Sequence, residues 1–221
     1  MQNNPQILIL LGRSGCGKGT QAKLLREKFG FEYMGSGESL REKVKTDGFS
    51  GKKIGEVTNS GSFVPVPVIF QIWINKLEEW KNSKPDLKGI IFDGSPRKLP
   101  EAMLLDESLE WYEWNKNIRV VLIDISEQEA FNRLTRRRIC KNCAKLIPYI
   151  GEYKNLNVCD ACSGELISRP DDKEVSIRGR LEEFTKEVLP VIEYYKQKGL
   201  LITISGDQTI EGVHESIVKA I

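Results

Sequence analysis

A glycine-rich loop at residues 12–20 constrains this chain more than any other feature. It reads Gly-Arg-Ser-Gly-Cys-Gly-Lys-Gly-Thr and lies between an aliphatic run at residues 7–11 and a segment of helical period at 21–29. A strand, a glycine-rich loop and a helix in this order form the setting in which successive backbone N–H groups surround a phosphate. An ordinary glycine turn is the alternative, and the spacing of Gly12, Gly17 and Lys18 argues against it.

Three residues of the loop refine this prediction. The helix start at Gly19 and Thr20 adds partial positive charge, and Lys18 brings a full positive charge to the terminal phosphates. Gly19 occupies the position where most loops of this kind carry the Ser or Thr that holds Mg²⁺. Cys16 lies in the same loop, and two interpretations of it stay open, a reactive thiol or a small inert loop residue.

The rest of the chain has the pattern of a parallel sheet covered by helices. Further strands are expected at residues 31–34, 89–92, 119–125 and 200–204. Helices are expected at 67–77, 100–111, 127–135 and 208–220, and two more from 173 onward that meet near Leu189. We expect Met103, Leu104 and Trp111 to lie in the core. Strands that alternate with helices predict an α/β fold with helices on both faces of the sheet.

Size and charge exclude several classes of protein. At 221 residues the chain is expected to form one domain with room for insertions. A net charge of +2 gives no bulk attraction to nucleic acid or to a membrane, and the sequence contains no apolar run long enough to span one. Because the first residues also lack a basic region and a signal-like apolar core, we expect a cytoplasmic protein.

Four of the five cysteines form two Cys-x-x-Cys pairs, Cys140 with Cys143 and Cys159 with Cys162. The fifteen residues between the pairs are a spacing typical of zinc held by four thiolates. Two disulfides or four buried thiols are the alternatives, but the first is rare in a cytoplasm and the second does not need this spacing. Because the protein would fill all four ligand positions, the sequence predicts a structural zinc that stabilises its own segment.

Charged residues gather near these motifs. Asp93 follows the strand at 89–92, at the carboxyl end where parallel sheets bind ligands, and Arg97 follows closely. A dense basic set flanks the cysteine segment: Arg133, Arg136, Arg137, Arg138, Arg169, Arg178 and Arg180. A solvated basic face or a nucleic-acid patch is one interpretation. The other is a clamp for phosphoryl transfer, in which positioning and neutralisation of charge dominate.

With these motifs together, the chain resembles the adenylate kinases and related nucleoside monophosphate kinases. The matching motifs are Gly-Lys-Gly-Thr-Gln at 17–21, Ser-Gly-Glu at 36–38 with Arg41, Asp-Gly-Ser-Pro-Arg at 93–97, the cysteine pairs, and Arg-Pro-Asp-Asp at 169–172. The resemblance implies a P-loop three-layer sandwich over residues 1–221, with an inserted monophosphate-binding helical segment at 35–64 and an inserted zinc-bearing lid at 136–172. It also implies a monomer that uses Mg²⁺ and structural Zn²⁺ and transfers phosphate reversibly from Mg-ATP to AMP, giving two ADP.

The resemblance implies a role for each matching residue. The ATP side would be formed by Gly15, Cys16, Gly17, Lys18, Gly19, Thr20, Arg133, Arg137 and Gln208. The AMP side would be formed by Ser36, Arg41, Ser62, Val64, Gly94, Arg97, Glu101, Arg169 and Arg180. The transfer itself would depend on Lys18, Arg97, Arg137, Arg169, Arg180 and Asp171. Asp93 would order the water shell of Mg²⁺, and Asp171 and Asp172 would pair with lid arginines on closure.

Three positions depart from the family pattern, since Ser14 replaces a proline, Ser95 a phenylalanine and Glu101 a glutamine. Glu101 would contact the acceptor base, so a kinase that acts on GMP or another nucleoside monophosphate remains an alternative. A zinc-containing ATPase that binds nucleic acid is an alternative from a different class. It would need neither Arg41 nor the motif at 93–97.

Overall fold

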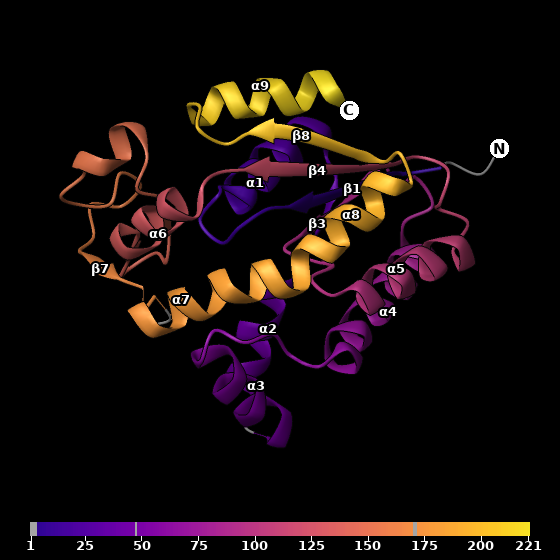
Figure 1. Ribbon diagram of the computed structural model, residues 1–221, viewed down its shortest axis with the longest axis horizontal. Coiled ribbons are helices and arrows are strands. Elements are labelled where there is room, and N and C mark those ends of the chain that lie inside the picture. The colour runs from indigo at the N-terminus through magenta and orange to yellow at the C-terminus, as the bar shows by residue number, and fades with distance from the viewer. Residues whose placement is uncertain (1–3, 47, 170–171) are drawn as a thin grey trace.

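A parallel sheet lies at the centre of the computed structural model, which describes residues 4–46, 48–169 and 172–221 (Figure 1). In this described part of the chain the sheet has five strands, in the order β2-β3-β1-β4-β8. Their bounds are β1 Gln6–Leu11, β2 Glu32–Gly35, β3 Gly89–Asp93, β4 Ile118–Asp124 and β8 Leu201–Ser205. The parallel α/β sheet predicted from the aliphatic runs is confirmed.

Alternation along β1 divides the core into two layers, one on each face of the sheet. Ile7 and Ile9 belong to the cluster formed with the helices of one face, and Leu8 and Leu10 belong to the cluster on the other. The first face is covered by α4 Val66–Ser83, α5 Leu99–Trp111 and α8 Leu189–Gln197. The second is covered by α1 Lys18–Phe29, α6 Glu127–Arg136, α7 Glu174–Glu183 and α9 Ile210–Ala220.

The order of the strands brings the predicted loops to one edge of the sheet. β1 lies between β3 and β4, with Leu10 opposite Asp93 and Leu11 opposite Leu122. The chain crosses to one side of β1 for β2 and β3 and to the other side for β4 and β8. A crevice therefore opens at the carboxyl end of β1, where open α/β sheets bind their ligands.

Two of the core predictions for α5 are wrong, because Met103 is 48% exposed and Trp111 is 77% exposed. The buried face of α5 is formed instead by Ala102, Leu105 and Leu109. These residues recur at the spacing of one helical face. The prediction chose the larger apolar residues Met103 and Trp111 and overlooked the small Ala102, which identifies the buried face.

The two predicted C-terminal helices are α7 and α8, and α8 begins at Leu189, where the sequence predicts that they meet. A π-helical turn, Phe184–Val188, joins α7 to α8, so the backbone stays helical through the junction (Figure 1). Pro190 lies in the first turn of α8, directly after Leu189, whose N–H reaches back five residues to Phe184 O in the π-helical turn. The long helical run carries Arg180 and Phe184 beside the phosphate loop.

Two excursions leave the sheet layers (Figure 1). The first consists of α2 Ser36–Lys45 and α3 Phe49–Asn59, between β2 and α4. The second, between α6 and α7, is a small antiparallel sheet of β5 Arg138–Cys140, β6 Leu146–Ile147 and β7 Leu166–Ser168, with a 3₁₀ turn η1 at Gly151–Asn155. Within the described ranges, no helix combines the length and apolar character that a membrane span requires.

Candidate active site

The phosphate loop curls around its own lysine at the carboxyl end of β1. Lys18 Nζ donates to the carbonyl oxygens of Gly12 at 2.7 Å and Arg13 at 2.9 Å, and it lies 3.6 Å from Cys16 Sγ. Gly12 has φ +140°, and a Cβ there would lie 2.7 Å from Cys16 Sγ, so the tight turn requires glycine. The loop then passes through Gly15, Gly17 and Gly19 to Thr20 in α1.

Arg13, which the sequence analysis did not assign to the site, ties this loop to two other elements. Its Nη1 donates to Ile125 O at 3.1 Å and lies 3.5 Å from Asp124 Oδ1 at the end of β4. Its guanidinium also lies over the Phe184 ring, 4.5 Å from the centroid. The presence of an arginine in a glycine-rich loop is visible in the sequence, but its partners Asp124, Ile125 and Phe184 could not be identified from spacing.

Asp93 ends β3 beside the first turn of α1. A Cβ built on Gly19 would lie 3.3 Å from Asp93 Oδ2, so this carboxylate faces the backbone position where other such loops carry Ser or Thr. The hydroxyl of Tyr33 donates to the same oxygen at 2.9 Å. A carboxylate next to a phosphate loop fits Mg²⁺, which prefers oxygen ligands together with substrate phosphates.

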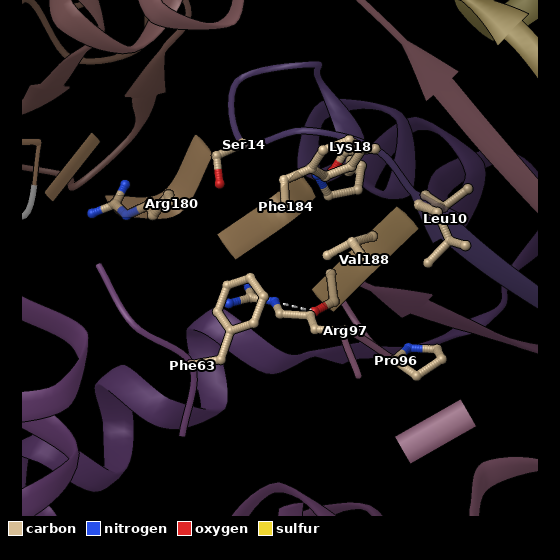
Figure 2. A pocket seen from close by; sticks show the side chains of 12 residues that line it. Leu10, Ser14, Lys18, Phe63, Pro96, Arg97, Arg180, Phe184 and Val188 are labelled. Atoms are coloured by element: carbon tan, nitrogen blue, oxygen red, sulfur yellow. Dashed lines mark hydrogen bonds between the residues drawn. The ribbon is translucent and has the colours of Figure 1, made fainter. Parts of the chain in front are cut away.

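A cleft lies in front of the loop and has an empty volume of about 350 Å³. Figure 2 shows Lys18 and Phe184 on one side of it, Arg180 on another, and Arg97 against Phe63. Arg97 Nε donates to Gly94 O at 2.6 Å, and its guanidinium lies 4.7 Å from the centroid of the Phe63 ring. Burial lowers the pKa of Arg97, and the nearby charges of Arg180 and Arg41 act in the same direction. Such crowding of cations suits an anionic ligand.

A second hollow shares Phe63 and Arg97 with the first and also includes Ser36, Ser62, Val64 and Glu101. Glu101 is 2% exposed, and its Oε2 accepts the backbone N–H of Arg97 at 2.7 Å, which ties the loop before α5 to the first turn of the helix. Burial raises the pKa of Glu101, and this hydrogen bond acts against the rise. The hydroxyls of Ser36 and Ser95 are in contact at the base of this hollow. A Cβ on Gly37 would lie 3.2 Å from Arg41 Nη1, so Arg41 lies along the start of α2.

Asp172 holds two arginines that approach from different elements. Its carboxylate makes two hydrogen bonds to Arg137, both of 2.7 Å, and one to Arg180, of 2.9 Å. The Asp172 side chain is 2% exposed, so this shared ion pair is shielded from water. Arg169 O accepts the backbone N–H of Asp172 at 3.0 Å, which places Arg169 beside this group. Asp171, to which the sequence analysis gave a role, lies outside the described residues.

Arg133 and Gln208 lie near the carboxyl end of β8. Arg133 donates through Nε to Glu129 Oε1 at 2.6 Å and through Nη2 to Gly206 O at 3.0 Å, and the residue is 8% exposed. Gln208 is exposed, and its Nε2 donates to Ser205 O at 2.9 Å. The structure therefore brings Arg133 to the segment that carries Gln208.

The four cysteine sulfurs of the lid converge. All lie within 4.8 Å of one another, with 3.4 Å between Cys140 and Cys162 and 3.6 Å between Cys143 and Cys159. A tetrahedral zinc with Zn–S bonds of about 2.3 Å requires sulfurs about 3.8 Å apart, so the cluster fits the ion. The residue after each pair, Ala144 or Ser163, adopts positive φ, and its N–H returns to the first cysteine of the pair. The backbone N–H of Cys143 lowers the pKa of Cys140, and at Cys162 the backbone N–H of Gly164 acts in the same direction but the neighbouring thiols raise the pKa.

Comparison with known proteins agrees with this geometry. The family model for adenylate kinase matches residues 10–200. The chain belongs to the adenylate kinase family. It is 41% identical over 213 residues to an adenylate kinase of Archaeoglobus fulgidus, with 95% of each chain covered. It is 39% identical over 217 residues to one of Caldicellulosiruptor bescii, covering 97% of this chain and 98% of the relative, and 41% identical over 216 residues to one of Citrifermentans bemidjiense, with the same shares.

Membership of the adenylate kinase family confirms the fold class and the kinase prediction. The roles of individual residues stay predictions, which the geometry supports unevenly. Lys18, Arg97 and Arg180 line one cleft, and Arg137 joins them through Asp172. Arg13, Tyr33, Phe63 and Phe184 belong to this site as well, although the sequence motifs assigned no role to them.

Proposed function

We propose that the protein transfers a phosphoryl group reversibly from Mg-ATP to AMP, giving two ADP. One observation carries this proposal, which is that Lys18 of the phosphate loop and the half-buried Arg97 line the same cleft. A kinase with two phosphate-bearing substrates needs cations on both sides of the transferred group. The family membership supports the same reaction.

In the proposed mechanism the chain supplies positioning and charge rather than a covalent intermediate. The N–H groups of the loop and Lys18 hold the phosphates of ATP, and Arg41 and Arg97 hold the monophosphate. Arg137, Arg169 and Arg180 neutralise charge as it spreads over the oxygens in the transition state. Mg²⁺ supplies further neutralisation when bound, and Asp93 is the residue that would hold its water shell.

Closure over both substrates is part of the proposal. We propose that residues 35–64 and 136–172 are inserted units that move relative to the rest of the single domain and exclude water, which would otherwise accept the phosphoryl group. Asp172 would keep Arg137 and Arg180 together as the lid moves, because it already binds both.

Arg133 and Gln208 would flank the ATP base, and Ser62 and Val64 would flank the acceptor base. The zinc would hold the lid segment in shape, with no role in transfer.

Glu101 favours a second candidate, a kinase of the same build that accepts GMP. A buried carboxylate offers only acceptors, which suits the two donors on the edge of guanine better than the mixed edge of adenine.

The nucleic-acid-binding alternative has less support, since Arg97, Arg137 and Arg180 are directed to the cleft and to Asp172. The zinc site requires reduced thiols, which supports a cytoplasmic location. The family membership supports a monomer.

The test is a coupled assay for ADP made from ATP in the presence of AMP, GMP, CMP or UMP. ADP formation that requires both ATP and AMP supports the proposal, and a preference for GMP supports the second candidate. ATP hydrolysis that is stimulated by nucleic acid and unaffected by any monophosphate would refute both.

A further inference from the structure

Tyr33 is a β2 residue whose hydroxyl lies next to the predicted magnesium site. It donates to Asp93 Oδ2 at 2.9 Å. Burial and the charge of Asp93 both raise the pKa of Tyr33, so the phenol keeps its proton and acts as the donor. The guanidinium of Arg26 lies over its ring, 5.2 Å from the centroid.

This arrangement depends on a glycine two residues later. A Cβ built on Gly35 would lie 2.6 Å from Tyr33 Cζ and 2.5 Å from Cε1, and it would also clash with the hydroxyl. The Tyr33 side chain therefore folds across Gly35 to reach Asp93, a path that any other residue at position 35 would block. Gly35 has φ −94° and ψ 103°, which alanine adopts without strain, so the glycine is required for space rather than for backbone conformation.

We propose that Tyr33 is a positioning residue for the magnesium of Mg-ATP. Its hydroxyl fixes one oxygen of Asp93, so the carboxylate meets the water shell of the ion in a single orientation beside Gly19. The inference rests on the proposed function, since Asp93 has this role only if Mg-ATP is a substrate. Hydrogen bonds from neighbouring residues orient metal-associated carboxylates in this way, and their removal usually weakens metal affinity or activity about 10- to 100-fold.

The test uses Tyr33→Phe, which removes the hydroxyl and keeps the ring. With the protein in excess over a non-hydrolysable ATP analogue, so that nearly all the nucleotide is bound, Mn²⁺ is titrated and the unbound ion is measured by electron paramagnetic resonance. We expect the dissociation constant of Mn²⁺ to rise about 10-fold in Tyr33→Phe. In the ATP-plus-AMP assay, the Mg²⁺ concentration at half-maximal rate should rise by a similar factor, and a high Mg²⁺ concentration should restore turnover.

Two further variants control the experiment. Gly35→Ala keeps the Tyr33 hydroxyl but displaces it, and it should reproduce the loss of metal affinity. Tyr112→Phe removes a matched hydrogen bond, from Tyr112 to Glu78 Oε2 at 2.8 Å, and should leave metal affinity unchanged. Unchanged Mn²⁺ affinity in folded Tyr33→Phe, or in Gly35→Ala if the first variant does not fold, would overturn the inference. A parent protein that makes no ADP at any Mg²⁺ concentration would instead refute the proposed function.

Discussion

Replacing Glu101 by glutamine should improve AMP as an acceptor and remove a pH dependence from AMP binding. Glu101 lines the second hollow, is 2% exposed, and has one carboxylate oxygen bonded to Arg97 N–H. A glutamine keeps an acceptor for this N–H and can offer its amide N–H to a base. The charged carboxylate has no donor for the adenine N1 lone pair, and a buried mismatch of this kind costs about 1–3 kcal/mol.

The direction of the pH effect follows from the raised pKa of Glu101. A protonated carboxyl has one donor and one acceptor, as an amide does, so it matches adenine. AMP binding then favours the protonated form, so the KM for AMP should increase as pH rises past the pKa of Glu101 in the free enzyme and should level off above its higher pKa in the AMP complex. In Glu101→Gln the profile should stay flat. Above that pKa, the two proteins should differ by about 5- to 150-fold in KM for AMP, the factor that corresponds to about 1–3 kcal/mol.

The same residue should affect stability, because its folded pKa is raised above the ordinary value of 4.5 by burial. A raised carboxyl pKa favours the folded state below the unfolded pKa, and this contribution is lost as pH rises through the folded value. Thermal melts should therefore show Glu101→Gln gaining stability over the parent as pH rises above about 4.5.

The assay measures KM and kcat for AMP and GMP across pH in the parent, in Glu101→Gln and in Glu107→Gln, an exposed position on the same helix that serves as control. Equal AMP-to-GMP ratios and equal pH profiles in the parent and Glu101→Gln would refute the reasoning, because they would show that the carboxyl does not contact the base.

Three further predictions concern the loop and the lid. Lys18→Met should fold, with kcat lowered at least about 100-fold in the coupled assay, and near-normal turnover would remove the phosphate loop from the mechanism. Metal analysis should find one zinc per chain, and Cys140→Ser should lose the metal and melt at a lower temperature in a calorimetric scan; a parent without any stoichiometric metal would exclude the site. Cys16, which is 3% exposed, should react slowly with a thiol reagent and more slowly with ATP present, as followed by mass spectrometry; equal rates would place it outside the nucleotide site.

The sheet and the phosphate loop were predictable because each depends on local pattern. An unbroken aliphatic run defines a buried parallel strand, and the loop at 12–20 carries its glycines at fixed spacing. The π-helical turn at Phe184–Val188 has no comparable signature, so the junction near Leu189 was predicted but the turn that joins the two helices was not. The exposure of Trp111 could not be predicted either, because a large aromatic residue at the end of a helix is compatible with both the core and the surface.

Some residues of the candidate site could be predicted from the sequence and others could not, and the difference has a physical reason. Residues that bind phosphate must match its geometry, so their types and spacing form motifs that a sequence displays. Residues such as Arg13 and Tyr33 act on other protein groups, and their partners lie far along the chain, at separations of 112 and 60 positions. Nothing near Tyr33 in the sequence identifies Asp93 as its partner, and Gly35 acquires a meaning only once the ring is seen to cross it. Sequence motifs therefore identify the residues that bind the phosphates, whereas the contacts that orient these residues are formed only in the folded protein.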